Sequence, residues 1–180
     1  TYLNFCTNNG RDIPYLADSY LTIVEDTFRE QIYFLKHKKY RHESYADVAQ
    51  SVYHNKDYMD RYMYGLAITS FFWPNHVEMR RFFLQTLPKD SGGNYLEIGP
   101  GHGYYLMTAM QQSAFDDFLG VDLSEASIRQ TRSIIEHFNP GSDDRFELRQ
   151  TDFLEAEDLL PGNFDAIVMG EVLEHVEQPE

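Results

Sequence analysis

The stretch YLEIGPGHGYYL at residues 95–106 carries three glycines within five residues, between two apolar runs. The short run that ends at Gly99 is typical of a buried strand, and the run that follows Gly103 is typical of a helix. Ligands of open parallel sheets bind at the carboxyl ends of the strands, which is where these glycines would lie. Glycine has no Cβ and accepts positive φ, so a bound molecule can approach the backbone closely. The stretch therefore predicts a strand, a ligand-binding loop and a helix.

The alternation of strand and helix continues through the second half of the chain. Ser124 is placed to cap one of the helices, and Asn139-Pro140-Gly141 would end it. Short connections between the two kinds of segment predict an α/β fold with a parallel sheet and helices on both of its faces. The expected strands are 94–99, 118–123, 145–150 and 164–170, with helices over 101–114 and 124–138 and a further helix opening at 172–178.

The first half of the chain differs, because its apolar residues recur at helical spacing. The segment PKDSGG at 88–93 combines Pro, Gly, Ser and charge, and is the expected boundary between the halves. We therefore expect a helical subdomain over residues 1–90 and a strand–helix domain over 91–180. The expected helices of the first half are 16–38, 44–53, 57–73 and 75–87.

Acidic residues are concentrated in the second half. Residues 1–90 hold 11 Lys and Arg against 11 Asp and Glu, whereas residues 91–180 hold 4 against 18 and carry the whole net charge of −14. A surface of that sign repels phosphate backbones, so nucleic acid is not expected as a partner. No apolar run approaches the ~20 residues that span a bilayer, so no membrane partner is expected either. The single cysteine, Cys6, cannot form an internal disulfide, which fits a reducing, cytoplasmic compartment.

The spacing of the glycines separates two classes of nucleotide cofactor. The dinucleotide fingerprint is G-x-G-x-x-G, and its third glycine lets helix and strand pack closely. Here the glycines are at 99, 101 and 103, and the position that the fingerprint requires is Tyr104. Glu97, at the end of the expected strand, is unfavourable beside a pyrophosphate and favourable beside an ammonium group. A nicotinamide-dependent oxidoreductase is therefore the less favoured alternative.

Four segments together resemble the class I S-adenosylmethionine-dependent methyltransferases, and they cover about residues 92–178. EIGPGHG at 97–103 is similar to motif I of that family, and GVDLS at 120–124 is similar to the segment that follows it. TDFLE at 151–155 resembles the acidic loop after the third strand, and FDAIVMGEVLEHV at 164–176 resembles motif IV of the small-molecule enzymes. The resemblance implies a Rossmann-like sheet in which the four strands have the order 3-2-1-4.

The resemblance also implies which residues bind S-adenosylmethionine, whose product is S-adenosylhomocysteine. Asp122 would accept hydrogen bonds from both ribose hydroxyls, and Asp152 would accept one from the adenine amino group. The backbone of Phe153 would pair with the ring edge, and Glu97 would lie near the amino group of the methionine part. The predicted cofactor-binding residues are Glu97, Gly99, Gly101, His102, Gly103, Asp122, Leu123, Asp152, Phe153, Gly170 and Glu171.

The class of acceptor is narrowed by motifs that the sequence lacks. The strand at 164–170 is not followed by the Asn/Asp-Pro-Pro-aromatic motif of enzymes that methylate amino groups of nucleic acids. Cytosine-C5 enzymes need a Pro-Cys nucleophile, and Cys6 does not follow a proline. Glu171 and Glu174 are too few acids for the metal-dependent catechol type, so no metal is predicted. A small molecule or a protein side chain remains.

A base is needed only where the acceptor's nucleophile arrives protonated. His175 has a suitable unperturbed pKa and lies near the cofactor motifs, so it is the candidate catalytic residue. The helical half is expected to form a lid that supplies the acceptor pocket, although its aromatic residues could instead form the core of a helical subdomain. The candidate lid residues are Tyr62, Tyr64, Trp73 and His76.

These observations predict an S-adenosylmethionine-dependent methyltransferase that methylates an oxygen, nitrogen or carbon atom of a small molecule. The alternatives are a protein-directed methyltransferase and a non-catalytic, cofactor-binding partner subunit. The sheet of the family has seven strands and this sequence supplies four, so a longer natural protein is expected. A homodimer is a further expectation.

Overall fold

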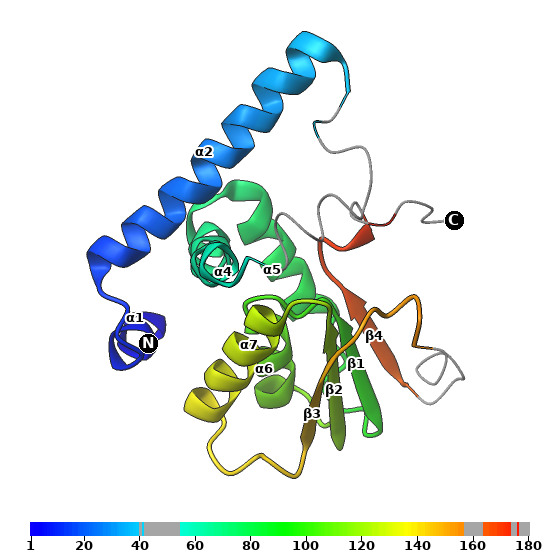
Figure 1. Ribbon diagram of the computed structural model, residues 1–180. Coiled ribbons are helices and arrows are strands. Elements are labelled where there is room, and N and C mark those ends of the chain that lie inside the picture. Colours follow the sequence, from blue (N-terminus) through cyan, green and yellow to red (C-terminus); the bar gives the residue numbers. More distant parts are fainter. Residues whose placement is uncertain (40, 42–54, 157–163, 174–175, 177–180) are drawn as a thin grey trace.

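The computed structural model describes residues 1–39, 41, 55–156, 164–173 and 176 of the chain (Figure 1). The helix expected over 44–53 lies outside the described residues, and so does most of the helix expected to open at 172–178. Figure 1 shows a helical part, coloured blue to green, and a sheet with its own helices, coloured green to red.

A parallel sheet of four strands has the order β3-β2-β1-β4, as the resemblance implied. The four strands coincide with the expected segments, so the predicted α/β fold is confirmed. The central strands β1 and β2 are buried on both faces over most of their length, which accounts for their nearly continuous apolar sequences. The strands are β1 Asn94–Ile98, β2 Asp117–Asp122, β3 Phe146–Gln150 and β4 Ala166–Met169.

Two helices, α6 (Tyr104–Gln112) and α7 (Glu125–Phe138), cover one face of the sheet (Figure 1). The crossovers that contain them step in the same direction along the sheet, and right-handed crossovers then place both helices on the same side. The expectation of helices on both faces is therefore not met within the described residues. Side chains from the loops after β3 and β4, among them Phe153 and Val172, pack against the second face instead.

The core between the sheet and these helices is rich in aromatic residues. Tyr95, Phe115 and Phe118 are each almost fully buried, and their ring centroids lie 5.5–6.2 Å apart. Gly120 in β2 lets α6 approach the sheet, because a Cβ there would lie 3.0 Å from the side chain of Leu106. The sheet and its helices are thus held at a fixed distance by close packing.

Among the described residues, four helices precede the sheet. Asp12 and Asn55 cap α2 and α4, because each side chain accepts a hydrogen bond from a backbone N–H in the first turn. Pro74 begins α5 and cannot continue the preceding helix, so the chain turns there. None of the helices in the described part is both long and apolar enough to cross a bilayer. The helices are α1 Tyr2–Asn8, which was not expected, α2 Ile13–His37, α4 Lys56–Phe72 and α5 Pro74–Thr86.

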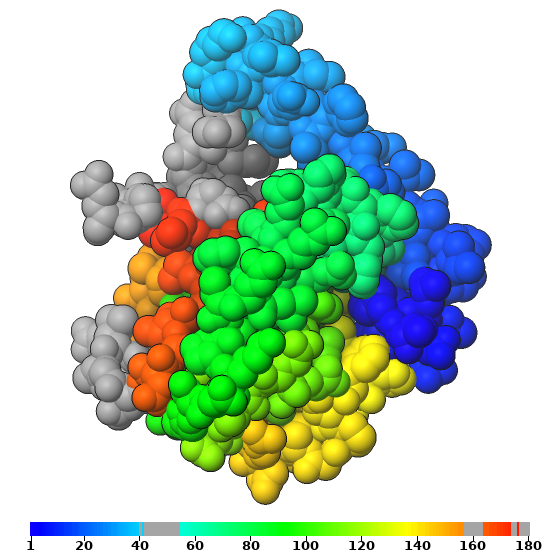
Figure 2. Space-filling model, turned by 180° about the vertical axis from the view of Figure 1, so that it is seen from behind, coloured from blue at the N-terminus to red at the C-terminus, as the bar shows by residue number. Residues whose placement is uncertain are grey.

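Helix α4 joins the helical part to the sheet part. It crosses α2 at Gly65, where a Cβ would lie 2.3 Å from a backbone oxygen of α2. On its other side it contacts α7, where the Ser127 hydroxyl lies 3.4 Å from the Met63 sulfur and Arg129 pairs with Asp60 at 3.1 Å. Figure 2 shows α2, in blue, standing above the green surface formed by α4 and α5. Helix α4 therefore sets the position of the helical part over the sheet.

Candidate functional site

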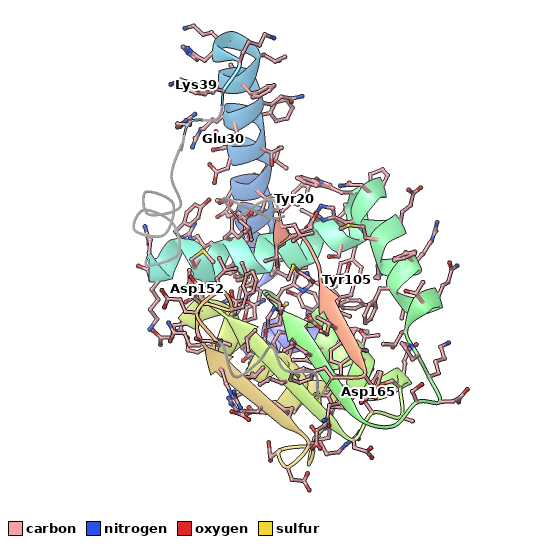
Figure 3. All side chains as sticks on the ribbon, turned by 90° about the vertical axis from the view of Figure 1, so that its right-hand side faces the viewer. Tyr20, Glu30, Lys39, Tyr105, Asp152 and Asp165 are labelled. Carbon is pink, nitrogen blue, oxygen red and sulfur yellow. The ribbon has the colours of Figure 1, made fainter. Side chains whose placement is uncertain are left out.

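A cleft of about 1610 Å³ opens at the carboxyl ends of the strands, below α4. Figure 3 shows Asp152 and Tyr105 towards the end of the sheet that faces α4, whereas Asp165 lies at the far end. One wall consists of the loops that follow the strands, and the other consists of α2, α4 and α5. Nine of the eleven predicted cofactor-binding residues line this cleft, and the two that do not are Glu97 and Gly103.

The three glycines of the loop after β1 all have positive φ, which is +70° at Gly99, +54° at Gly101 and +78° at Gly103. Of the three, Gly101 is the one that is open towards the cleft, since a Cβ there would meet nothing closer than the Met63 sulfur at 3.7 Å. Its N–H donates to the carboxylate of Asp122 at 3.1 Å. Gly101 thus has the clearance that the sequence predicted for a ligand.

Gly99 and Gly103 make room for protein neighbours. A Cβ on Gly99 would lie 2.5 Å from the side chain of Val172, and one on Gly103 would lie 2.8 Å from the Cα of Thr131 in α7. Gly103 also caps α6 and does not line the cleft. The missing side chain of Gly103 thus lets α6 and α7 pack together, and its role in binding the cofactor stays a prediction.

Glu97 lies behind the glycine loop. Its side chain is 2% exposed, accepts a hydrogen bond from the Tyr95 hydroxyl at 2.8 Å, and bonds to the backbone of Leu106 in α6. Burial raises the pKa of Glu97 to about 8. Glu97 does not line the cleft in this structure, and contact with the amino group of a ligand stays a prediction.

Asp122 ends β2 and faces the cleft. One carboxylate oxygen accepts the N–H of Gly101 at 3.1 Å, and the other accepts the N–H of Ser124 at 2.8 Å. Burial raises the pKa of Asp122 to about 6, although these hydrogen bonds oppose the shift. A carboxylate has about four acceptor positions, so acceptor capacity remains for donors in the cleft. Leu123 lines the cleft beside it.

Asp152 and Phe153 follow β3, where the resemblance placed the contacts to adenine. The Asp152 carboxylate accepts the N–H of Leu154 at 3.0 Å, which closes a tight turn. Phe153 packs with apolar side chains of β1 and β2 on the second face of the sheet. The turn thus places a carboxylate beside an apolar surface, a combination that suits a flat, nitrogen-rich ring.

Three polar side chains from distant segments meet where β4 ends. Glu171 has a φ of +54°, which is uncommon for a residue with a Cβ. Its Oε1 lies 3.3 Å from Nε2 of His76 in α5, and Nδ1 of His76 lies 2.7 Å from the Thr69 hydroxyl in α4. This Thr69–His76–Glu171 cluster connects the loop after β4 to both helices of the expected lid.

His102 lies beside the cluster and is 7% exposed, with its Nδ1 accepting the N–H of Tyr104 at 3.2 Å. Burial lowers the pKa of His102 to about 4. The charge of Glu171 opposes this shift, and His76 lowers the pKa further. The His102 imidazole is therefore uncharged at neutral pH. Burial, with a contribution from Glu171, raises the pKa of Tyr105 to about 12.

Three of the four candidate lid residues line the cleft. Tyr62 and Trp73 do so beside His76, and the Trp73 indole donates to the Tyr20 hydroxyl at 3.1 Å. Tyr64 is corrected, because it is 8% exposed and packs in the main core, away from the cleft. Residues two apart in a helix point in roughly opposite directions, about 200° apart, so Tyr62 and Tyr64 could not both face the cleft.

His175, the candidate catalytic residue, lies outside the described residues. Thr69 and Met63 also contact the site from α4, and neither was predicted from the sequence. Neither has a local sequence signal, because a threonine and a methionine within an apolar helix are typical of core positions. In the described part of the chain, no three His, Cys, Asp or Glu side chains gather as a metal site.

Residues 96–180 match the family model of the methyltransferase domain. Over these residues the sequence is similar to a methyltransferase domain, and the fold is that of class I methyltransferases of known structure. The matched region begins in β1 and includes every loop of the sheet that lines the cleft. Helices α1, α2, α4 and α5 lie outside the part that the methyltransferase model matches.

Solved structures share the fold of this methyltransferase domain. A protein of Methanococcus maripaludis described as an S-adenosyl-L-methionine-dependent methyltransferase has a TM-score of 0.51 at 19% identity, over 66% of this chain and 53% of that chain. Magnesium protoporphyrin IX methyltransferase of Synechocystis PCC 6803, solved with bound SAM, has a TM-score of 0.52 at 15% identity. The match covers 77% of this chain and 67% of that chain. The chain spans about half the length of the first solved structures that it matches. No curated protein sequence matches the chain significantly.

Proposed function

We propose that the chain binds S-adenosylmethionine in the cleft and transfers its methyl group to an oxygen, nitrogen or carbon atom of a small molecule. The observation that carries the proposal is the placement of Gly101, Asp122 and Asp152 along one edge of the sheet in a methyltransferase domain. When bound, this cofactor supplies an activated methyl group on a positively charged sulfur.

The residues of the cleft fit that cofactor. Gly101 leaves the backbone open to close approach, and Asp122 keeps acceptor capacity for two ribose hydroxyls. Asp152 offers an acceptor for the adenine amino group, and Phe153 lies beside it on the apolar face of the sheet. Each group lies at the carboxyl end of a strand, so a single extended ligand can reach them all.

A small molecule is favoured as the acceptor because helices cover the side of the cleft that faces the strand ends. Tyr62, Trp73 and His76 line that side, so an acceptor has to fit between the helices and the sheet. Transfer also needs the nucleophile held in line, about 3 Å from the methyl carbon and shielded from water. A bulky protein chain would have to displace α4 or α5 to reach the same position.

The cofactor proposal is tested by calorimetric titration with S-adenosylhomocysteine and, separately, with NADH. We expect micromolar binding of the first and none of the second. Asp122→Ala is expected to weaken binding at least about tenfold, because it removes a charged acceptor of two hydrogen bonds. Asp117→Ala, at the exposed opposite end of the same strand, is the matched control and should bind as the wild type does. Binding of NADH, or full affinity in Asp122→Ala, would contradict the proposal.

Turnover assays distinguish the proposed enzyme from its alternatives. Transfer of a labelled methyl group to a panel of small molecules supports the proposal, and transfer to proteins alone supports a protein-directed enzyme. Binding without any transfer supports a non-catalytic partner subunit. Tyr62→Ala and Trp73→Ala should lower turnover if the helices form the acceptor pocket, and unchanged turnover would argue against that role.

The proposal also includes a helical subdomain over residues 1–90, a cytoplasmic location, a homodimer and a catalytic role for His175. The free thiol of Cys6 is buried, which is compatible with a reducing compartment. Analytical ultracentrifugation tests the homodimer, and a pH–rate profile of His175→Asn tests the catalytic role.

A further inference from the structure

The Thr69–His76–Glu171 cluster stands at the opposite side of the cleft from the proposed adenine contacts. Glu171 follows β4 and Asp152 follows β3, and these two strands are the opposite edges of the sheet. The cluster is therefore placed where an acceptor would enter, between β4 and α5.

Glu171 and His76 both line the cleft, and Glu171 is the more exposed of the two. The His76 side chain is 8% exposed, and its two ring nitrogens face Thr69 and Glu171. Thr69 is fully buried and its hydroxyl also bonds to the Leu66 carbonyl at 2.7 Å. The Glu171 side chain is 37% exposed and lines the cleft. His76 and Thr69 thus hold the Glu171 carboxylate from the protein side.

The backbone of Glu171 shows that the surrounding structure imposes this position. Its φ of +54° is unfavourable for any residue with a Cβ. On one side of it Gly170 passes close to the Tyr105 ring, and on the other Val172 packs on Gly99. A strained residue that carries a partly exposed carboxylate, fixed by a buried imidazole, is typical of a functional position.

We propose that Glu171 accepts the proton of a hydroxyl group on the acceptor and that His76 and Thr69 position its carboxylate. The inference rests on the proposed function and names the class of its acceptor. The acceptor's O–H bond breaks and its proton passes to Glu171, while an oxygen lone pair forms the bond to the methyl carbon. The electron pair of the methyl–sulfur bond stays on the sulfur, which leaves as a neutral thioether. No other reactant is needed.

Charge selects a hydroxyl over the other nucleophiles. An ammonium group would be repelled by the positive sulfur about 3 Å away, and a carboxylate would be repelled by Glu171 and would need no base. The walls around the cluster are apolar and aromatic, with Phe83 and Tyr105 in edge-to-face contact at 4.7 Å and Trp73 edge-on to His76 at 5.1 Å. The acceptor class is therefore a hydroxyl compound with an apolar body.

The test uses 4-nitrophenol as the probe on protein loaded with S-adenosylhomocysteine, because the ionised probe absorbs visible light and the neutral probe does not. At a pH equal to the probe's own pKa, the bound probe should be at least about threefold less ionised in the wild type than in Glu171→Gln, because the carboxylate accepts a hydrogen bond from the neutral phenol and repels the phenolate. Glu78→Gln removes an exposed carboxylate of α5 outside the cleft and should match the wild type. 4-Nitroanisole, which has no proton to lose, should bind to the wild type and Glu171→Gln alike.

Positioning by His76 has its own readout. In His76→Leu the Glu171 carboxylate is no longer held, so the ionised fraction of the probe should rise as it does in Glu171→Gln. His76→Gln should reverse part of that rise, because an amide can still donate to the carboxylate. Glu171→Gly provides a second variant that removes the strain, so it should fold at least as well as the wild type and still show the raised ionised fraction.

The outcomes separate this inference from the function on which it rests. Equal ionised fractions in the wild type, Glu171→Gln and Glu171→Gly, or no binding of the probe to the loaded wild type, overturn the role of Glu171. A His76→Leu fraction equal to that of the wild type overturns positioning by His76. Affinity for S-adenosylhomocysteine should stay within about threefold in every variant. Failure of the wild type to bind it would overturn the proposed function instead.

Discussion

Asp122, Glu97 and His102 show how burial changes the chemistry of single side chains in this site. Burial raises the pKa of Asp122 to about 6 and that of Glu97 to about 8, and it lowers the pKa of His102 to about 4. In each case the charged form loses hydration that the surrounding groups only partly replace. Asp122 and His102 line the cleft, so they should make the site sensitive to mildly acidic pH.

We expect the affinity for S-adenosylhomocysteine to fall as the pH drops below about 6, the pKa of Asp122. Above that pH the ionised carboxylate accepts from the ribose hydroxyls, and below it protonation removes part of its acceptor capacity. Calorimetry should show several-fold weaker binding at about pH 5 than at about pH 7.5. Asp122→Asn should bind weakly at both values. A wild-type affinity that is flat across this range would count against the role of Asp122.

His102 should lower the stability of the fold in acid. Its pKa is lowered from 6.5 in the unfolded chain to about 4 in the folded chain. Between these two values the unfolded chain therefore binds a proton at this imidazole and the folded chain does not. Its contribution to stability is complete above pH 6.5 and is lost as the pH falls towards 4. Urea denaturation should therefore show a smaller drop in the free energy of unfolding between these values for His102→Gln than for the wild type. His137→Gln, at an exposed position of α7, is the control and should behave as the wild type.

At the scale of elements, glycines set how closely segments approach, and their roles differ within one loop. The missing side chain of Gly101 leaves the cleft open, that of Gly99 makes room for Val172, and that of Gly103 makes room for α7. In the helical part, the missing side chain of Gly65 makes room for the backbone of α2. A positive φ is shared by the three glycines of the loop, so the neighbours and not the backbone angle distinguish them.

Gly103→Ala should lower the free energy of unfolding by about 2–4 kcal/mol, because it combines an unfavourable positive φ with a clash against α7. Gly101→Ala should cost only the backbone term of about 1–2 kcal/mol and should weaken binding of S-adenosylhomocysteine. Gly141→Ala is the matched control, with a φ of +81° and open space around it. Urea denaturation measures all three, and equal losses in Gly103→Ala and Gly141→Ala would rule out the packing role.

At the scale of the whole molecule, α4 couples the helical part to the sheet. One of its faces packs on α2 at Gly65, and another contacts α7 through Met63 and Asp60. The His76–Glu171 contact adds a connection between α5 and the loop after β4. The cleft exists only where the two parts meet, so the site and the cooperativity of folding depend on the same contacts.

We expect the two parts to unfold together. The single tryptophan, Trp73, reports on the helical part by fluorescence, whereas far-ultraviolet circular dichroism reports on the whole chain. The two denaturation curves should coincide, and S-adenosylhomocysteine should raise both midpoints equally by mass action. A fluorescence midpoint that does not shift when S-adenosylhomocysteine is added would show that the helical part folds independently of the cofactor site.

The sequence by itself determined the alternation of strands and helices, the strand order implied by its motifs, and the positions of Asp122 and Asp152. These followed from the sequence because periodicity is a local signal and because parallel strands bring their carboxyl ends to one edge. The helices expected over 57–73 and 75–87 likewise differ from α4 and α5 by one residue at each end.

Only the tertiary structure decided which side chains reach the cleft. It placed Tyr62 in the cleft and Tyr64 in the core, and it buried Glu97 behind the glycine loop. It also brought His76 of α5 into contact with Glu171, which follows β4. None of these outcomes has a local signal, because each depends on which face of one element meets which face of another. Close packing and burial fix those choices, and they act only after the distant parts of the chain have come together.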